Sequence, residues 1–591
     1  MKNFKKNICF ILIFMLALTT FVGCDSSSGE LEDGLYTGTA QGHNAEIEVE
    51  VTIDEGDIAG IEIVSHEETP VLSDPVFNDL KDMMVEHNSI NIDMVSGATI
   101  TSMGLRNAVK AAMEEAGATE EYFDQGKNLS LDYGAADEEK EYDVVVVGAG
   151  GAGMIAAIEA KSQGAEVAII EKNPFVGGNT LVSGGEFNAP NSWVQEIMDV
   201  EDSVEQYIED TLSGGDYKAD EDLVRIMAEN ITEDGEWLRD FVEVEFIEDY
   251  LMHFGGHSVP RAIYPIGGSG IELIQKLERK IYEMEIPLYL EMEASEIMVD
   301  ENERVVGIKA QNPEGESVHY YGVNGVVLTT GGFGANLEMV QEHNDTIDER
   351  YMSTNQKGAT GDGIIMAKDI GADVRDMEYV QTYPTCNPRT GHLSYVADTR
   401  FDGAILVNKE GERFVEELDR RDVISEAILA QTESYGYLMW DETIRQNSNM
   451  DSYLTEFESL ENQDLIVKAD TIEEAAEFFG IEVETLKKTI EKYNGFAEQG
   501  QDEDFQRRGS LVALEEGPYY IQKVVPAIHH TMGGLKINGD TQVISTDGEW
   551  IEGLYAAGEL TGGIHGKNRL GGNAISDLIV FGRIAGRNAA Q

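Results

Sequence analysis

The stretch Tyr142-Asp143-Val144-Val145-Val146-Val147-Gly148-Ala149-Gly150-Gly151-Ala152-Gly153 decides the fold of this chain. Its first half is an apolar run of the kind found in a buried parallel strand, and a helix-like segment follows it to Gln163. A second apolar strand then ends at Glu171, 18 positions beyond Gly153. In this context Gly148, Gly150 and Gly153 permit a tight turn and the close approach of a pyrophosphate at the helix N-terminus. The pattern predicts a dinucleotide-binding fold in which Glu171 accepts hydrogen bonds from the adenosine ribose.

A second glycine-rich surface follows this motif. Gly177-Gly178-Asn179-Thr180 and Ser183-Gly184-Gly185 come directly after the ribose-binding acid. This arrangement favours FAD over NAD as the dinucleotide.

Length and charge limit the classes of function. A chain of 591 residues allows three or four domains at roughly 150 residues each. Hydrophobic residues make up 42% of the chain, which is typical of a globular protein. The formal net charge is −69, from 111 acidic and 42 basic residues. Such a surface repels a phosphate backbone, so we expect no nucleic-acid partner and attribute the charge to solubility.

The N-terminus has the features of an export signal. Lys2, Lys5 and Lys6 precede an apolar run at 8–21 that is shorter than the about 20 residues needed to span a bilayer. Phe21-Val22-Gly23-Cys24 then resembles a bacterial lipoprotein signal, in which the cysteine is lipidated. An ordinary signal peptide with an incidental Cys24 is the alternative, but Gly23 and the polar residues at 25–29 favour lipidation. We therefore expect a signal peptide at 1–23, a tether at 24–32, and an exported protein held on the extracytoplasmic face of the membrane by its lipid.

Cysteine usage excludes several cofactors. The chain has Cys9 in the signal, Cys24 at the anchor and Cys386. With Cys24 acylated, the mature protein has no pair for a disulfide and no metal framework. It also lacks a Cys-x-x-Cys-His motif, which excludes covalent c-type haem. Electrons must arrive by another carrier.

The pattern along the chain predicts several domains. A small α+β domain at 33–120 contains strands near 45–53 and 58–64, a helix near 78–86 and another from about Thr101 to a stop at Gly117. A polar linker at 121–140 follows. The dinucleotide-binding domain occupies 141–376 and 529–591, and a more helical, charged segment at 377–528 lies between them.

Four later motifs carry a family resemblance: residues 358–363 (GATGDG), 529–534 (HHTMGG), 558–559 (GE) and 565–574 (HGKNRLGGNA). Across about 141–591 the chain resembles the FAD subunit family of fumarate reductase and succinate dehydrogenase. The resemblance implies an α/β fold, with a Rossmann-like FAD-binding domain and an inserted α+β capping domain at 377–528. It also implies non-covalent FAD lined by Ala152, Glu171, Asn179, Thr180, Gly184, Gly185, Ala294, Asp362, His530, Glu559, Ala574 and Ile575.

The resemblance further implies hydride transfer from flavin N5 to the carbon β to a carboxylate, with a proton delivered to the α-carbon. His529 and Arg569 match the positions that bind the substrate carboxylate. Arg421 matches the proton donor, a role that needs a relay because arginine is a poor acid. Without the resemblance, an arginine among acids at 417–422 would be interpreted as a solvated ion-pair cluster.

Two departures from the fumarate pattern bear on the substrate. Tyr383 stands where those reductases have the His of Gln-x-His-Pro, and Val396-Ala397, followed by Asp398, stand near their Thr-Glu pair. These changes disfavour a dicarboxylate, which Asp398 would repel. The set is similar to that of urocanate reductases, in which Asp398 would pair with the imidazole N–H and Tyr383 would pack against or bond the ring. The alternatives are a core aromatic for Tyr383 and a helix cap or surface charge for Asp398.

The N-terminal domain has its own motif. Asp93-Met94-Val95-Ser96-Gly97-Ala98-Thr99 resembles the sequence that bacterial flavin transferases recognise when they attach FMN to the threonine. It implies an FMN-binding domain with covalent FMN on Thr99, whose phosphate the following helix N-terminus favours. Thr101 is the less favoured attachment point, and a simple loop and N-cap is the alternative.

Together these features predict an electron path from a membrane-associated donor to FMN, then to FAD, then to an enoate, with urocanate favoured. Fumarate, an aryl acrylate and methacrylate are alternative substrates. A dehydrogenase or oxidase working in the opposite direction and a flavin electron carrier without substrate are alternative functions.

Overall fold

The computed structural model describes residues 31–41, 46–54, 56–66, 76–90, 92, 99–119, 122–123, 138–312, 315–448 and 450–591. The chain divides into two compact units, residues 1–130 and 131–591. The predicted signal peptide, the lipidation site Cys24 and the motif residues 93–98 lie outside the described residues. Within the described ranges, no helix has the length and apolarity to cross a membrane.

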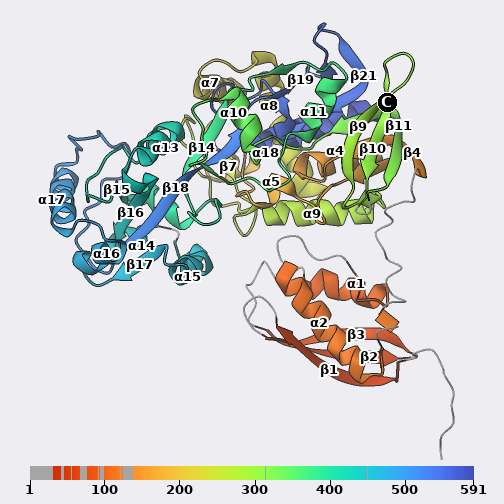
Figure 1. Ribbon diagram of the computed structural model, residues 1–591, viewed down its shortest axis with the longest axis horizontal. Helices are drawn as coiled ribbons and strands as arrows, with labels where there is room; N and C mark the ends of the chain where they lie inside the picture. Colours follow the sequence, from red (N-terminus) through yellow and green to blue (C-terminus); the bar gives the residue numbers. More distant parts are fainter. Residues whose placement is uncertain are drawn as a thin grey trace, which may run out of the picture. The chain divides into compact units, whose positions relative to one another are not determined.

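The first unit is a small sheet covered by helices (Figure 1). Strands β1 (Gly34–Gln41), β2 (Glu46–Asp54) and β3 (Asp57–Ser65) form an antiparallel sheet in that order. The alternation in β2 buries Ile47, Val49, Val51 and Ile53 in one core with the helices. These helices are the π-helical turn η1 (Val76–Leu80), α1 (Lys81–Glu86) and α2 (Thr99–Glu115). Helix α2 begins two residues before the expected Thr101, and the chain turns at Gly117 with φ 104°.

The second unit is organised around a mostly parallel sheet. Its central strands run in the order β21-β11-β4-β5-β8 and pair in parallel: Trp550–Ala556, Ser317–Leu328, Glu138–Val147, Val167–Ile170 and Leu288–Tyr289. Strand β20 (Gln542–Ile544) adds an antiparallel edge. Strands β9 (Glu293–Val299) and β10 (Val305–Gln311) continue from β11 as an antiparallel meander. The chain must cross over to join one parallel strand to the next. The helices in these crossover segments supply the rest of the hydrophobic core.

Helices α4 (Gly151–Ser162) and α18 (Asn573–Ala589) share the hydrophobic core with β4 and β5. They pack closely because α18 presents glycine at the contact. A Cβ added at Gly586 would lie 2.1 Å from the Ala156 carbonyl oxygen. The other helices of this part are α5 (Gly178–Leu181), α6 (Trp193–Ile197), α7 (Val204–Gly214), α8 (Glu221–Asp240), α9 (Gly270–Glu283), α10 (Leu337–His343) and α11 (Asp362–Asp369).

Strand β4 begins earlier than its apolar pattern suggests. The sequence places the start at Tyr142, whereas the strand begins at Glu138. Residues 138–141 pair in parallel with 318–321 of the long strand β11. Backbone pairing needs no apolar side chain, so hydrophobicity alone does not reveal this extension.

The cap segment forms a second core around its own sheet. Strand β18 (Tyr519–Thr531) is central, and it pairs with β16 (Gly436–Asp441), β17 (Ile466–Ala469), β14 (Val380–Cys386) and β12 (Met352–Ser353). Strand β15 (Ile405–Val407) pairs with β16. Figure 1 shows β18 running from the helices of the cap into the body of the unit. Those helices are α12 (Thr399–Asp402), α13 (Arg421–Leu429), α14 (Glu442–Asn447), α15 (Leu454–Asn462), α16 (Ile472–Phe479) and α17 (Val483–Gln499).

Candidate active site

One cavity of about 1530 Å³ lies in the second unit and is lined by both the glycine-rich motifs and the cap. It gathers most of the residues expected to bind FAD: Gly148, Gly150, Ala152, Glu171, Asn179, Thr180, Gly184, Ala294, Asp362, His530, Glu559, Ala574 and Ile575. All five residues expected at the substrate also line it: Tyr383, Asp398, Arg421, His529 and Arg569. Segments that are far apart in the sequence therefore meet at one site.

Two expected glycines lie behind the wall of the cavity. A Cβ at Gly153 would meet the Gly148 carbonyl oxygen at 1.9 Å, so this glycine lets α4 pack against the preceding turn. Gly185 has φ 74°, and a Cβ there would meet the backbone of Gly270 at 2.9 Å. Both glycines shape the site through backbone packing.

The dinucleotide end of the cavity fits the expected cofactor. Gly150 caps α4, and a Cβ there would meet nothing closer than 3.9 Å, so the helix N-terminus is open to a phosphate. Glu171 is buried and accepts the Ala149 N–H at 2.8 Å, which fixes its carboxylate beside the glycine turn. His530 Nε2 is buried and has no hydrogen-bond partner among the described residues. An unpaired polar atom at this depth is expected where a ligand completes the site.

Hydrogen bonds hold the polar residues of this end in place. Asn179 donates to Glu559 Oε2 at 3.0 Å, and the other oxygen of Glu559 accepts the Thr531 N–H at 3.0 Å. Asp362 forms an ion pair with Lys172. These contacts join the loop after Glu171 to segments more than 180 residues away.

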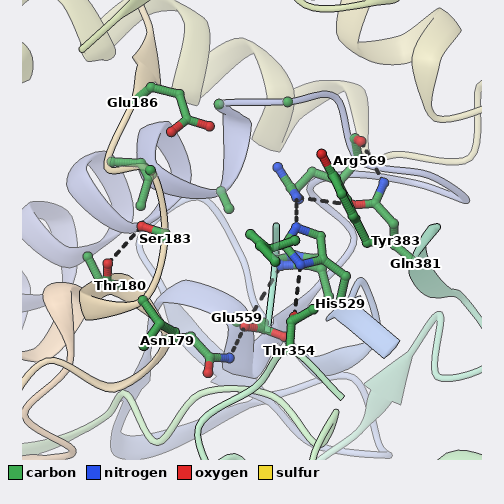
Figure 2. Close-up of a pocket in the computed structure, with 18 of the residues that line it drawn as sticks. Asn179, Thr180, Ser183, Glu186, Thr354, Gln381, Tyr383, His529, Glu559 and Arg569 are labelled. Carbon is green, nitrogen blue, oxygen red and sulfur yellow. Dashed lines mark hydrogen bonds and ion pairs between the residues drawn. The ribbon is translucent and has the colours of Figure 1, made fainter. Parts of the chain in front are cut away.

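The pair expected to bind the substrate carboxylate is well defined. Strand β18 positions His529, and the loop before α18 positions Arg569, whose Nη2 lies 3.1 Å from His529 Nε2 (Figure 2). Because a guanidinium only donates, His529 Nε2 is the acceptor and Nδ1–H donates to Thr354 Oγ1 at 3.0 Å. Burial, together with Arg569 and Arg421, holds the pKa of His529 well below its ordinary value. His529 is therefore neutral, and the positive charge of the pair belongs to Arg569.

The two adjacent arginines at the start of α13 lie in different surroundings. Arg420 is exposed and pairs with Asp422 at 3.0 Å and with Asp216 at 3.3 Å. Arg421 lines the cavity, and its Nη1 donates to Gln381 Oε1 at 3.1 Å. The solvated ion-pair interpretation therefore describes Arg420. Burial lowers the pKa of Arg421, and the nearby charge of Arg400 lowers it further.

Tyr383 and Asp398 form a hydrogen-bonded pair next to Arg421. Tyr383 is 8% exposed, its hydroxyl donates to Asp398 Oδ1 at 3.3 Å, and the Arg421 guanidinium lies 4.7 Å from its ring centroid. The Asp398 side chain caps no helix. Burial raises its pKa to about 6, although Arg400, Tyr383 and Arg421 favour the ionised form. An acid and a phenol thus face the cavity together.

The structure adds residues that the sequence did not single out. The Glu186 carboxyl group lines the cavity in Figure 2, and burial raises its pKa while Arg569 and Arg421 oppose the shift. Its sequence signal is weak: an acid directly after Ser183-Gly184-Gly185. No feature of the sequence pointed to Thr354, because a single threonine outside any motif does not indicate a contact with a histidine 175 residues away.

Comparisons with known proteins agree with this geometry. A family model described as FAD binding domain matches residues 143–575, and one described as FMN-binding domain matches 42–114. Urocanate reductase of Eggerthella lenta is 41% identical over 558 residues, which cover 94% of this chain and 92% of that protein. The chain belongs to the FAD-dependent fumarate reductase and succinate dehydrogenase flavoprotein family.

Other members of this flavoprotein family are also similar. The fumarate reductase (cytochrome) of Shewanella frigidimarina is 40% identical over 454 residues, covering 76% of this chain and 77% of that protein. The open conformation of a flavocytochrome c3 fumarate reductase superposes with a TM-score of 0.69 at 39% identity, covering 79% of this chain and 80% of that chain. These findings confirm the predicted fold class. This flavoprotein is an FAD-dependent oxidoreductase of the type that acts on carbon–carbon bonds, and it carries an FMN-binding domain.

Proposed function

We propose that the protein saturates the double bond of urocanate and forms dihydrourocanate (imidazole propionate). The observation that carries this proposal is the Tyr383–Asp398 pair, which lines the same cavity as the carboxylate-binding pair His529 and Arg569. A substrate with one carboxylate and a hydrogen-bonding ring can use both pairs, because the ring centroids of Tyr383 and His529 lie 5.4 Å apart. The urocanate reductase of Eggerthella lenta, at 41% identity, adds support.

The carboxylate end orients the substrate. Arg569 makes charge-assisted hydrogen bonds to the carboxylate, and neutral His529, in the tautomer with its proton on Nε2, donates a further hydrogen bond. Thr354 serves either tautomer of His529, because a threonine hydroxyl both donates and accepts. Holding the carboxylate fixes the position of the double bond and draws electron density from its β-carbon.

The ring end discriminates between substrates. Asp398 above pH 6 is an acceptor for an imidazole N–H, and the ring of Tyr383 packs against the heterocycle. Glu186 adds a second acid to the cavity wall. Ionised Asp398 would repel a second substrate carboxylate, which disfavours fumarate.

Proton delivery is assigned to Arg421. FAD, when bound, supplies the hydride to the β-carbon. Arg421 donates a proton to the α-carbon, and its lowered pKa makes the guanidinium a better acid than it is in water. The lost proton is restored through neighbouring titratable groups, of which the hydrogen-bonded pair Tyr383 and Asp398 is the candidate beside it.

An anaerobic assay tests the substrate. The purified, flavinylated protein is mixed with a reduced viologen dye, and reoxidation is followed with urocanate, fumarate, an aryl acrylate and methacrylate. We expect the highest kcat/KM with urocanate. Fast turnover of fumarate without turnover of urocanate would overturn the assignment, and no turnover with any enoate would favour an electron carrier.

The electron supply is part of the same proposal. FMN attached to Thr99 by a flavin transferase would receive electrons from a membrane-associated donor and pass them to FAD. Thr99 is the first residue of the 17-residue helix α2, whose N-terminus favours a phosphate. The lipid on Cys24 would hold the exported protein at the membrane surface. A tryptic peptide that contains Thr99 and carries the mass of FMN would support the attachment, and an unmodified peptide from functional protein would refute it.

A further inference from the structure

Gln381 lies between the two arginines of the site. Its side chain extends from β14 and is 3% exposed. Its single carbonyl oxygen accepts from Arg421 Nη1 at 3.1 Å and from Arg569 Nη2 at 3.0 Å. Its amide nitrogen donates to Asn568 Oδ1 at 2.7 Å and to the Arg569 carbonyl oxygen at 2.8 Å. All four of these contacts are made by one buried amide.

This network fixes the orientation of the amide. Guanidinium groups only donate, so the oxygen of Gln381 must face Arg421 and Arg569. A flipped amide would place its N–H groups against two donors and its oxygen against the Arg569 carbonyl oxygen. Only one orientation satisfies every partner, and the residue therefore holds the arginines at a defined separation.

The neutrality of Gln381 matters as much as its shape. Arg569 is buried, and burial together with the charge of Arg421 lowers its pKa to about 10. Two buried guanidiniums repel each other, and an amide dipole between them reduces this repulsion without cancelling either charge. A carboxylate at the same position would form ion pairs with both arginines and compete with the substrate for them.

We propose that Gln381 is the positioning residue of this site: its oxygen sets the spacing of Arg421 and Arg569, and its neutrality leaves the charge of Arg569 to the substrate carboxylate and the proton of Arg421 to the α-carbon. The inference rests on the proposed roles of these arginines in carboxylate binding and proton donation. It is independent of which enoate is the substrate. A purely structural role would require only that the amide anchor the loop at Asn568.

Two variants of the flavinylated holoenzyme separate these possibilities. Gln381→Glu keeps the shape and adds a charge, whereas Gln381→Met removes the hydrogen bonds without adding charge. Gln501→Glu is the matched control, because it makes the same chemical change at an exposed residue after α17. FAD content and thermal unfolding report whether each variant folds.

The first readout is the affinity for a saturated monocarboxylate that cannot be reduced, titrated through the absorbance of the bound FAD. The carboxylate of Gln381→Glu competes with the ligand for Arg569, so we expect binding to weaken by about 10- to 100-fold, the size of one hydrogen bond to a charged group. Gln381→Met should also weaken binding, and Gln501→Glu should bind as the wild type does. Wild-type affinity in both Gln381 variants would overturn the proposal.

The second readout is the pH profile of kcat. A carboxylate beside Arg421 raises the pKa of its guanidinium, so the alkaline limb should move to higher pH in Gln381→Glu while kcat falls. In Gln381→Met, kcat should fall and the alkaline limb should move no higher. Equal profiles in both variants would indicate a structural role only. If the wild type reduces no enoate, the proposed function fails, while the binding titration still tests Gln381.

Discussion

Replacing Asp398 by asparagine should make the protein more stable and less active. Burial raises the pKa of Asp398 from its ordinary value of 3.8 to about 6. The ionised carboxylate is thus disfavoured in the folded state, and the protein loses stability as the pH rises from 3.8 through 6. Each unit of pKa corresponds to about 1.4 kcal/mol, so the charged Asp398 costs at most about 3 kcal/mol at pH 8. The asparagine side chain of the variant is neutral at every pH and avoids this cost.

The assay for stability is urea unfolding with the same excess of FAD in every sample. We expect the free energy of unfolding of the variant to exceed that of the wild type by up to about 3 kcal/mol at pH 8. At pH 5 the difference should be about half of that, because Asp398 of the folded wild type is mostly protonated there. Asp369→Asn, at the exposed end of α11, is the control for loss of an acid. A variant that is less stable than the wild type at pH 8 would refute the reasoning.

The same variant tests the ring end of the site. Loss of the charged acceptor should raise KM for urocanate by about 10- to 100-fold. Because asparagine does not repel a carboxylate, the ratio of kcat/KM for fumarate to that for urocanate should rise. An unchanged ratio, measured by dye reoxidation at pH 8, would show that Asp398 does not discriminate between these substrates.

Three other predictions concern substitutions of single residues. Arg421→Lys should lower kcat by about 100- to 10,000-fold but leave the affinity for a saturated carboxylate within a few-fold, as measured by dye reoxidation and titration. Gly153→Ala should abolish FAD retention, because its Cβ would lie 1.9 Å from the Gly148 carbonyl oxygen; absorbance after gel filtration checks this. Thr99→Ala should lose the flavin fluorescence that survives denaturation yet keep dye-driven activity. Thr101→Val should keep this flavin fluorescence. If only Thr101→Val lost it, the FMN attachment point would be Thr101.

The elements around the glycine motif were predictable from the sequence because their signal is local. The strand, the glycine turn, the helix and Glu171 follow one another within 30 residues, and each has a propensity or periodicity that is readable without tertiary contacts. The positions of β2 and β3 in the first unit were readable for the same reason, since the alternation in β2 is strict, whereas β1 was not predicted.

The substrate end was less predictable from residue patterns. Arg420 and Arg421 are chemically identical, and only the start of α13 decides which one reaches Gln381 and Tyr383. Glu186, Gln381 and Thr354 are brought together from different strands and loops, and their partners lie up to 188 residues away. The family resemblance supplied the roles proposed for the arginines and His529, which composition and spacing could not.

Strand β18 belongs to both the cap and the candidate active site. Its first half pairs with β16 and β17 inside the cap core, and its second half pairs with β14, which carries Gln381 and Tyr383. His529 and His530 lie near its end. A substitution in the cap core that shifts β18 should therefore also shift His529, although the substituted residue lies far from the cavity.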